Sequence, residues 1–591
     1  MDEWHSGSES DEPDQLQSCY GSTCSLCRFE VVPGENIVAV LDDGKISTEF
    51  RFGPVITRDD SLSAVLVHCQ GSCTHSYGWA FACHVQCFRF TGYKPSMDLF
   101  RALAYELAPS AAVQKQRYKW LQSSFVLHLK LGSRRLPHEL SLLIAQYCIR
   151  EYAIAATWLQ TSGPNTYSVG VLGGIWACYV MIDGVRYISS FANKPSANAQ
   201  LILGIEEAAD THQIYVAEDH LGIRRVCFRH SSPPCSNDSA SELWWRTFSV
   251  HDGTRIRVHA DGLKIRRLEC TPSDAISELA TNIAWLTPEP RPDLIRLRPI
   301  SAFPRTHLRM ASTVCNDPRT TAYSASWLFH VFHLHAHIDG EDSKYNSVTL
   351  PSAKHMIWLY MPINKGEYIS QIWKRAAPII HNHDLALLMV TNKGRTMMLG
   401  AQLRYHWAPC NWTLLYSSDG SASRIFFEAC PWGISKLGFE SPEPARQGRL
   451  PFIPPPTSPY PEATVLNQYT YSSAALESVV ALTPCEVKVA GKPSIIGLLF
   501  RYSDGSRACL GQFRLDWATA PLVVDGSSKL WLTFDMDDGG PFVDSVGVSH
   551  PPKPMSPRCL HISWVGKLEW WAGCGQCKVY YQNQASLITK C

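Results

Sequence analysis

Two closely spaced pairs of Cys and His residues constrain the fold of the N-terminal part of this chain more than any other feature. The first pair lies in Cys24-Ser-Leu-Cys27 and the second in Cys83-His84-Val-Gln-Cys87. Structural zinc takes four nitrogen or sulfur ligands, and a two-residue spacing presents two of them on one side. We therefore expect Cys24, Cys27, His84 and Cys87 to hold one structural zinc ion. The alternative is that reduced cysteines pack there as small hydrophobic side chains.

This ligand pattern resembles the LIM, RING and other treble-clef zinc folds, which implies a structural and not a catalytic metal. The chain departs from those families because the long segment 28–83 separates the two pairs. A hairpin must be inserted there, and Val38-Ala-Val-Leu-Asp-Asp-Gly44 is a candidate for it. The same insertion offers further ligands that could complete a second site or replace members of the first: His68, Cys69, Cys73 and His75.

Charge and cysteine usage limit the environment and the partners that we expect. The 54 Lys and Arg residues nearly balance the 53 Asp and Glu residues, so no global field draws the chain to nucleic acid or to an anionic membrane. The acidic, polar N-terminal segment lacks the apolar core of a signal peptide, and no run of about eighteen apolar residues suggests a membrane span. We expect an intracellular protein, in cytoplasm or nucleus, whose cysteines are reduced.

The period of the apolar residues indicates a multidomain, mainly β chain. Helical spacing extends from Met97 to Tyr147, and after about residue 166 short alternating runs and turn dipeptides such as Asp183-Gly184 indicate antiparallel strands. Proline clusters near residues 288–292 and 451–456 are expected to be linkers. The expected organisation is a disordered acidic tail (1–20), a Cys/His module (21–95), a helical segment (96–160), a Pro-rich linker (446–462) and two to three antiparallel β domains of β-prism or β-sandwich type (166–287, 293–445 and 463–591).

One predicted helix suggests a protein partner. Leu136-Pro-His-Glu-Leu-Ser-Leu-Leu-Ile resembles the opening of an F-box, which implies a helix that docks on a ubiquitin-ligase adaptor. The alternative is an ordinary packing helix that buries one apolar stripe. That stripe comprises Leu136, Leu140, Leu143, Ile144 and Tyr147.

Pieces of the C-terminal third resemble jacalin-like lectin domains, which are β-prisms of three four-stranded sheets. The pieces are 366–372 with 387–394, 497–505 and 540–547. In the last piece the resemblance implies a sugar-binding Gly-x3-Asp loop at Gly540 and Asp544. The resemblance therefore implies a glycan ligand. The turns at Gly394 and Gly505 also lie in similar segments, each of which is expected to form a strand, a glycine turn and a strand. These segments are consistent with related β domains.

One strand offers an alternative metal site. In Phe332-His-Leu-His-Ala-His-Ile338, alternation places His333, His335 and His337 on one face, neighbours about 6.6 Å apart. We find no carboxylate after them that would act as a general base, so a half-buried strand with a solvated histidine face is the simpler interpretation. Cys574-Gly-Gln-Cys577 with Cys591 offers only half of a further zinc site.

Together these features predict a non-enzymatic recognition or adaptor protein, with structural zinc and β domains that bind a protein or a glycan. No catalytic residue is assigned, because Walker, Gly-x-Ser-x-Gly and His-Glu-x2-His motifs are absent. The alternative is a metal-dependent hydrolase that uses the histidine strand. The order of zinc module, F-box-like helix and β domains also resembles lineage-specific fungal families of unknown function, which implies no activity.

Overall fold

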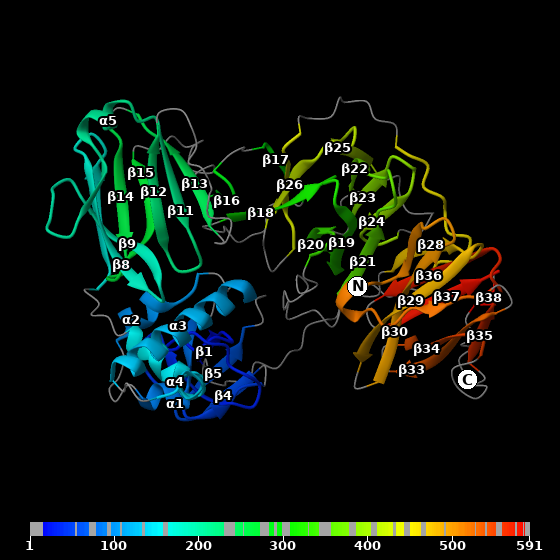
Figure 1. Ribbon diagram of the computed structural model, residues 1–591, viewed down its shortest axis with the longest axis horizontal. Coiled ribbons are helices and arrows are strands. Elements are labelled where there is room, and N and C mark those ends of the chain that lie inside the picture. The colour runs from blue at the N-terminus through cyan, green and yellow to red at the C-terminus, as the bar shows by residue number, and fades with distance from the viewer. Residues whose placement is uncertain are drawn as a thin grey trace, which may run out of the picture. The chain divides into compact units, whose positions relative to one another are not determined.

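The computed structural model shows a mainly β, multidomain chain that divides into two compact units, Met1–Glu289 and Pro290–Cys591 (Figure 1). The division falls within the first proline cluster. The residues that the structure describes are 16–53, 56–69, 78–90, 96–106, 109–132, 136–157, 163–229, 243–251, 253–271, 283–288, 292–297, 308–328, 330–341, 356–376, 386–402, 411–428, 433–441, 450–461, 469–489, 492–525, 528–537, 540–550, 558–573, 576–582 and 584–585. Among them, no helix has the length and apolar character needed to span a bilayer.

The first unit begins with a six-stranded sheet covered by helices. Its strand order is β3-β2-β6-β1-β5-β4, and β1 runs parallel to β5 and β6. The strands are β1 (Leu16–Tyr20), β2 (Asn36–Leu41), β3 (Phe50–Arg51), β4 (Ile56–Asp59), β5 (Ala64–His68) and β6 (Trp79–His84). The helices are α1 (Val85–Phe90), α2 (Met97–Leu103), α3 (Ala111–Gly132) and α4 (His138–Ala156). A turn with Gly44 at a φ of 79° follows β2, where a hairpin was expected.

Helix α4 exposes three of the five residues in the apolar stripe that an ordinary packing helix would bury, while Leu136 and Ile144 are half-buried. Leu140, Leu143 and Tyr147 are 48%, 49% and 80% exposed. The buried face instead carries mainly small side chains, including Ser141, Ala145 and Ala153. Small side chains let a neighbouring helix approach closely, and α3 is the helix that packs most extensively on α4.

The rest of the first unit consists of antiparallel strands around one core. The strand orders are β10-β8-β9, β15-β14-β7 and β12-β11-β13-β16. The elements are β7 (Asn165–Gly170), β8 (Ile175–Ile182), β9 (Val185–Ala192), β10 (Gln200–Leu203), α5 (Ile205–Ala209), β11 (Gln213–Glu218), β12 (Ile223–Arg229), β13 (Trp244–Ser249), β14 (Arg255–Ala260), β15 (Ile265–Thr271) and β16 (Ile283–Trp285). The predicted Asp183-Gly184 turn joins β8 to β9, with φ values of 50° and 78° that are typical of a type I′ hairpin turn.

The second unit begins with three groups of antiparallel strands that share one core. Their orders are β20-β19-β21, β24-β23-β22-β25 and β18-β26-β27-β17. The strands are β17 (Leu294–Arg296), β18 (Leu308–Cys315), β19 (Thr320–Leu328), β20 (His330–Ile338), β21 (Ile357–Pro362), β22 (Ile369–Ala376), β23 (Ala386–Thr391), β24 (Thr396–Leu399), β25 (Asn411–Ser417), β26 (Ser423–Glu428) and β27 (Lys436–Phe439).

A second core lies among the C-terminal strands. The orders are β28-β36-β37-β38 and β32-β29-β30-β34-β33-β35, and β31 pairs with β30. The elements are β28 (Thr470–Ala475), β29 (Val479–Val489), β30 (Lys492–Tyr502), β31 (Arg507–Gly511), the 3-10 helix η2 (Leu515–Trp517), β32 (Leu522–Val523), β33 (Leu530–Asp537), β34 (Gly540–Val548), β35 (Cys559–Ile562), β36 (Lys567–Gly573), β37 (Gln576–Tyr581) and β38 (Gln584–Ala585).

The two similar segments around Gly394 and Gly505 form matching hairpins, as predicted. Gly394 donates its N–H to Thr391 O at 2.9 Å, and Gly505 donates its N–H to Tyr502 O at 3.0 Å. The glycine φ values are 77° and 81°, a left-handed conformation that glycine adopts without strain. Strand, glycine turn and strand therefore occur in both halves of the second unit.

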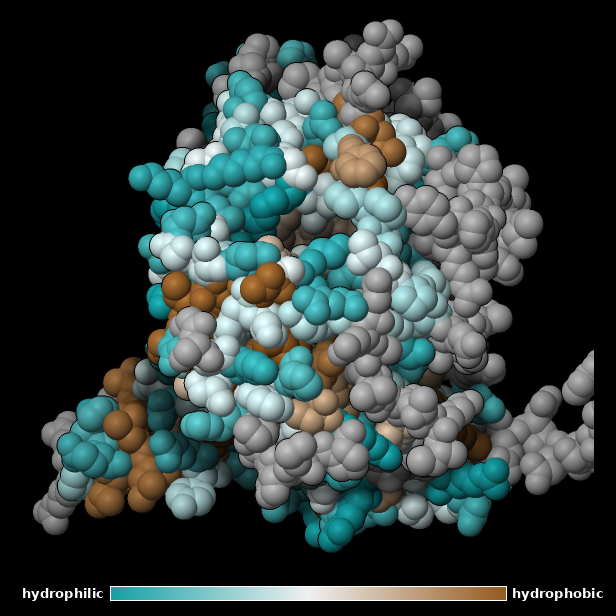
Figure 2. Space-filling model, turned by 90° about the vertical axis from the view of Figure 1, so that its right-hand side faces the viewer, coloured by the Kyte–Doolittle hydropathy of each residue, from teal (hydrophilic) through white to brown (hydrophobic). Residues whose placement is uncertain are grey.

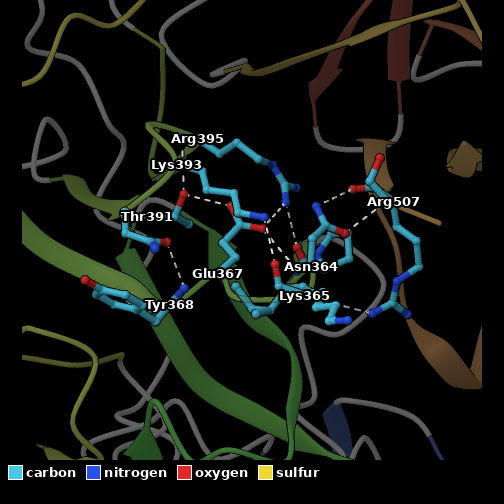
Figure 3. A network of polar contacts seen from close by, with 12 residues as sticks. Asn364, Lys365, Glu367, Tyr368, Thr391, Lys393, Arg395 and Arg507 are labelled. Carbon is cyan, nitrogen blue, oxygen red and sulfur yellow. Dashed lines mark hydrogen bonds and ion pairs between the residues drawn. The ribbon is translucent and has the colours of Figure 1, made fainter. Parts of the chain in front are cut away.

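Side chains near these hairpins form the polar network shown in Figure 3. Glu367 accepts from the Thr391 hydroxyl at 2.8 Å and from Arg395 Nη1 at 2.7 Å. The Asn364 side chain accepts from Arg507 N at 2.9 Å, and the Arg507 guanidinium donates to Thr321 O at 3.0 Å. The first residue of β31 is thus tied to the strands that precede β22.

Candidate metal centre

Cys24 and Cys27 lie in a tight turn between β1 and β2. Arg28 N donates to Cys24 O at 2.8 Å, and Cys24 N donates to Phe29 O at 2.9 Å. Arg28 takes a left-handed φ of 60°, which closes the turn. Ser25 N also donates to Ala82 O at 2.7 Å, so the turn is fastened to β6. The short Cys-x2-Cys spacing therefore directs both sulfurs toward the end of that strand.

His84 and Cys87 approach the same point from the junction of β6 and α1. His84 is the last residue of β6, and Cys87 lies in the first turn of α1. His84 Nδ1 is 3.4 Å from Cys27 Sγ and 3.6 Å from Cys87 Sγ, and His84 N lies 3.4 Å from Cys24 Sγ. One ligand atom from each of the four residues lies within 4.8 Å of every other, and all four residues are buried. The cluster could hold a metal ion.

The thiols of this cluster influence one another's ionisation. Burial opposes ionisation, but hydrogen bonds from Cys27 and Cys83 hold the pKa of Cys24 well below its usual range. Burial and the contact with Cys24 raise the pKa of Cys27, and the contacts with Cys24 and Cys27 raise the pKa of Cys87. A bound cation would favour ionisation of all three thiols of the cluster.

Glu35 fixes the orientation of the histidine, and the sequence interpretation missed it. Its Oε2 lies 3.3 Å from His84 Nε2, so the other ring nitrogen, Nδ1, faces the sulfurs. Oε2 also accepts from Val32 N at 2.8 Å, and Oε1 accepts from Arg150 Nη2 of α4 at 2.9 Å. Burial would raise the pKa of Glu35, but these two donors lower it. No motif identifies Glu35, because only the pairing of β2 with β6 brings it to His84.

The other candidate ligands of the insertion lie apart from this cluster where the structure describes them. The His68 ring stacks on Tyr20 at 5.5 Å and contacts Phe52 at 4.6 Å, and burial lowers its pKa. Cys69 follows β5 and is half-buried. Cys73 and His75 lie outside the described residues. Cys83 is buried beside the cluster but is not one of its four members.

The histidine strand is β20, and its side chains are less solvated than expected. Leu334 and Ala336 on the alternate face enter the core, as predicted, but His337 is also buried. Burial lowers the pKa of His333 to about 4 and that of His337 to about 3, with His335 contributing to both shifts. Contrary to the sequence interpretation, a carboxylate does follow: Glu341 joins His335 and His337 in a second group that could hold a metal ion. His333 is not a member of that group.

The proposed sugar-binding pair lies on strand β34 and not in a loop. Asp544 occupies a bulge, because Ser545 pairs with Thr533 while Val543 pairs with Phe534. The Thr533 hydroxyl donates to Asp544 Oδ1. Gly540 has a φ of 119°, and a Cβ there would approach Gln576 Oε1 at 2.7 Å. In the C-terminal Cys motif, Cys577 is buried in the core, while Cys574 and Cys591 lie outside the described residues.

No protein-family model matches this chain, and comparison with curated proteins finds no significantly similar sequence.

Proposed function

We propose that this chain is a non-enzymatic recognition or adaptor protein whose N-terminal module is built around one structural zinc ion. The observation that carries the proposal is the buried, closed group of Cys24, Cys27, His84 and Cys87. Structural zinc sites use four protein ligands of this kind, whereas catalytic sites keep one position for water or substrate. Four buried protein ligands leave no such position.

The distances within the group support zinc as its ion. Zinc lies about 2.3 Å from sulfur and about 2.0 Å from nitrogen, so tetrahedral geometry separates a nitrogen and a sulfur ligand by about 3.5 Å. The two separations of His84 Nδ1 from Cys27 Sγ and Cys87 Sγ are 3.4 and 3.6 Å. A dication would also offset two of the three thiolate charges and stabilise the sheet around them.

The exposed stripe on α4 supports a protein partner. Leu140, Leu143 and Tyr147 follow the i, i+3, i+7 spacing by which an amphipathic helix enters a hydrophobic groove. The F-box resemblance covers the first turns of the same helix and names the ubiquitin-ligase adaptor as the partner. The β domains then serve to recognise a protein or a glycan. On the face that Figure 2 shows, hydrophobic side chains gather in separate groups between hydrophilic ones.

Two measurements on the full-length protein test the proposal. Metal analysis should find zinc that is lost together with the folded N-terminal module when a strong chelator is added. A metal-free protein with that module intact would refute the zinc site.

A pull-down with purified ubiquitin-ligase adaptor should succeed with the wild type and fail with L140D/L143D. Gln146→Asp, exposed on the same helix, is the matched control. Absence of binding by the wild type would remove the adaptor assignment.

Glycan recognition has its own test. A glycan array probed with the wild type and with D544N should show a sugar ligand that the variant no longer binds. If the array shows no ligand, the β domains are assigned to protein recognition instead.

A further inference from the structure

Strand β20 presents two imidazoles near one edge of a small sheet. Among the described residues β20 pairs only with β19, and the register places His335 opposite Ser324 and His337 opposite Ala322. The rings of His335 and His337 lie 4.8 Å apart, centroid to centroid. His337 Nε2 is 2.9 Å from the Ser324 hydroxyl, so its other nitrogen, Nδ1, is directed away from Ser324.

A tight turn after β20 brings a carboxylate close to one nitrogen of each ring. Glu341 N donates to Ile338 O at 3.1 Å, and Gly340 adopts a φ of 80° that favours glycine. Glu341 Oε2 accepts in return from Ile338 N at 3.3 Å. As a result Glu341 Oε1 lies 2.8 Å from His335 Nε2, and Oε2 lies 3.7 Å from His337 Nδ1.

The three side chains offer one ligand atom each, and these atoms lie within 4.8 Å of one another. Ligands of a tetrahedral zinc ion at about 2.0 to 2.1 Å lie about 3.3 Å from each other, so only small rotations are needed to enclose an ion. The partial exposure of the His335 and Glu341 side chains, 22% and 27%, leaves a path from solvent.

We propose that His335, His337 and Glu341 form a second metal site, which binds a divalent transition-metal ion through two imidazoles and one carboxylate. Imidazole and carboxylate ligands suit Zn²⁺ and its neighbours in the first transition row. Three protein ligands leave one position for water or another small ligand, in contrast to the closed N-terminal group. The Ser324 hydroxyl contacts His337 Nε2 and so orients the ring, as outer hydrogen-bond partners of metal-bound histidines do. His333, which contacts Phe427 at 6.2 Å between ring centroids, is outside the site.

Metal content separates this site from the N-terminal one. Full-length protein equilibrated with Zn²⁺ and freed of excess metal should contain about two zinc ions per chain, and both H335Q and E341Q should contain about one. His333→Gln, on the same strand, is the matched control and should retain both ions. Thermal melting of each variant should show a folded second unit.

Cobalt substitution distinguishes the two sites by their ligands. Cobalt bound by thiolates absorbs strongly in the near ultraviolet, whereas cobalt bound only by nitrogen and oxygen does not. E341Q should therefore lose one equivalent of Co²⁺ without loss of the thiolate band. The proposal is overturned if the wild type binds only thiolate-held metal, or if H335Q and E341Q bind as much metal as the wild type. Either result would assign Glu341 to an ion pair with His335. If Co²⁺ bound to the wild type shows no thiolate band, the N-terminal zinc site is refuted and this second site is not.

Discussion

Asp183 Oδ2 lies 2.6 Å from Nη2 of Arg28, the residue that follows the candidate ligand Cys27. Arg117 Nε contacts the same oxygen at 2.5 Å, and its Nη2 donates to Cys27 O at 2.6 Å. The tip of the β8–β9 hairpin is thereby joined to the cysteine turn and to α3. Gly184 permits this approach, because a Cβ at its position would lie 2.3 Å from Trp120 Nε1.

Replacing Asp183 should destabilise the first unit. Burial alone would raise the pKa of Asp183, but Arg28 and Arg117 lower it, so the carboxylate is ionised. Asp183→Asn would leave two buried guanidiniums without a counter-charge, and we expect a loss of about 3 kcal/mol in the free energy of unfolding. Urea unfolding measures this value. Asp43→Asn, in the exposed turn after β2, is the control and should leave stability nearly unchanged. Equal effects of the two substitutions would contradict the structure.

The ligand assignment predicts opposite behaviour for two neighbouring cysteines. Cys87→Ser should abolish metal binding at the N-terminal site and unfold the N-terminal module, because one of the four assigned ligands is lost. Cys83→Ser should retain the metal, since Cys83 is buried beside the cluster without belonging to it. Zinc content and circular dichroism of the purified variants check both outcomes. A C83S protein that contains one zinc ion fewer than the wild type would show that the ligand set is wrong.

Glu35 should control metal affinity without touching the metal. Glu35→Gln weakens the partner of His84 Nε2, and losing such an outer partner costs about 10-fold to 100-fold in affinity. Competition with a chromogenic chelator measures the change. Glu30→Gln, an exposed position in the same segment, should leave the affinity unaltered. The same affinity in both variants would mean that Glu35 serves only to hold Arg150.

The N-terminal Cys/His cluster was predictable because each pair of its residues depends on spacing along a few residues. Glu35 and Glu341 were not, since each reaches its histidine through a fold: the pairing of β2 with β6, or a turn after β20. The stripe of α4 shows a different limit. Helical periodicity identified Leu140 and Leu143 as one face, but it does not reveal which face receives a neighbour. The small side chains of Ser141 and Ala145 mark that face, because they allow α3 to approach.

The described part of the proline-rich segment makes contacts that its sequence did not indicate. The segment was expected to be a linker, yet in its described part Thr457 N and Ser458 N donate to Glu569 of β36 at 3.1 and 2.7 Å. The Tyr471 hydroxyl also donates to Glu569, and Lys567 Nζ lies 2.7 Å away. Burial alone would raise the pKa of Glu569, but these contacts hold it well below its usual range.

A depressed pKa stabilises the folded form at pH values above the unfolded pKa of about 4.3, and that contribution is lost as the pH falls through the lower folded value. Glu569→Gln should therefore lower stability at pH 7 by about 2 kcal/mol and lose its effect in acid. Hydrogen exchange should show faster exchange at the Thr457 and Ser458 amides. Glu477→Gln is the control, because this exposed carboxylate also accepts from a backbone amide, that of Gly566. If E569Q left exchange in residues 451–461 unchanged at neutral pH, Glu569 would not be what holds the segment against β36.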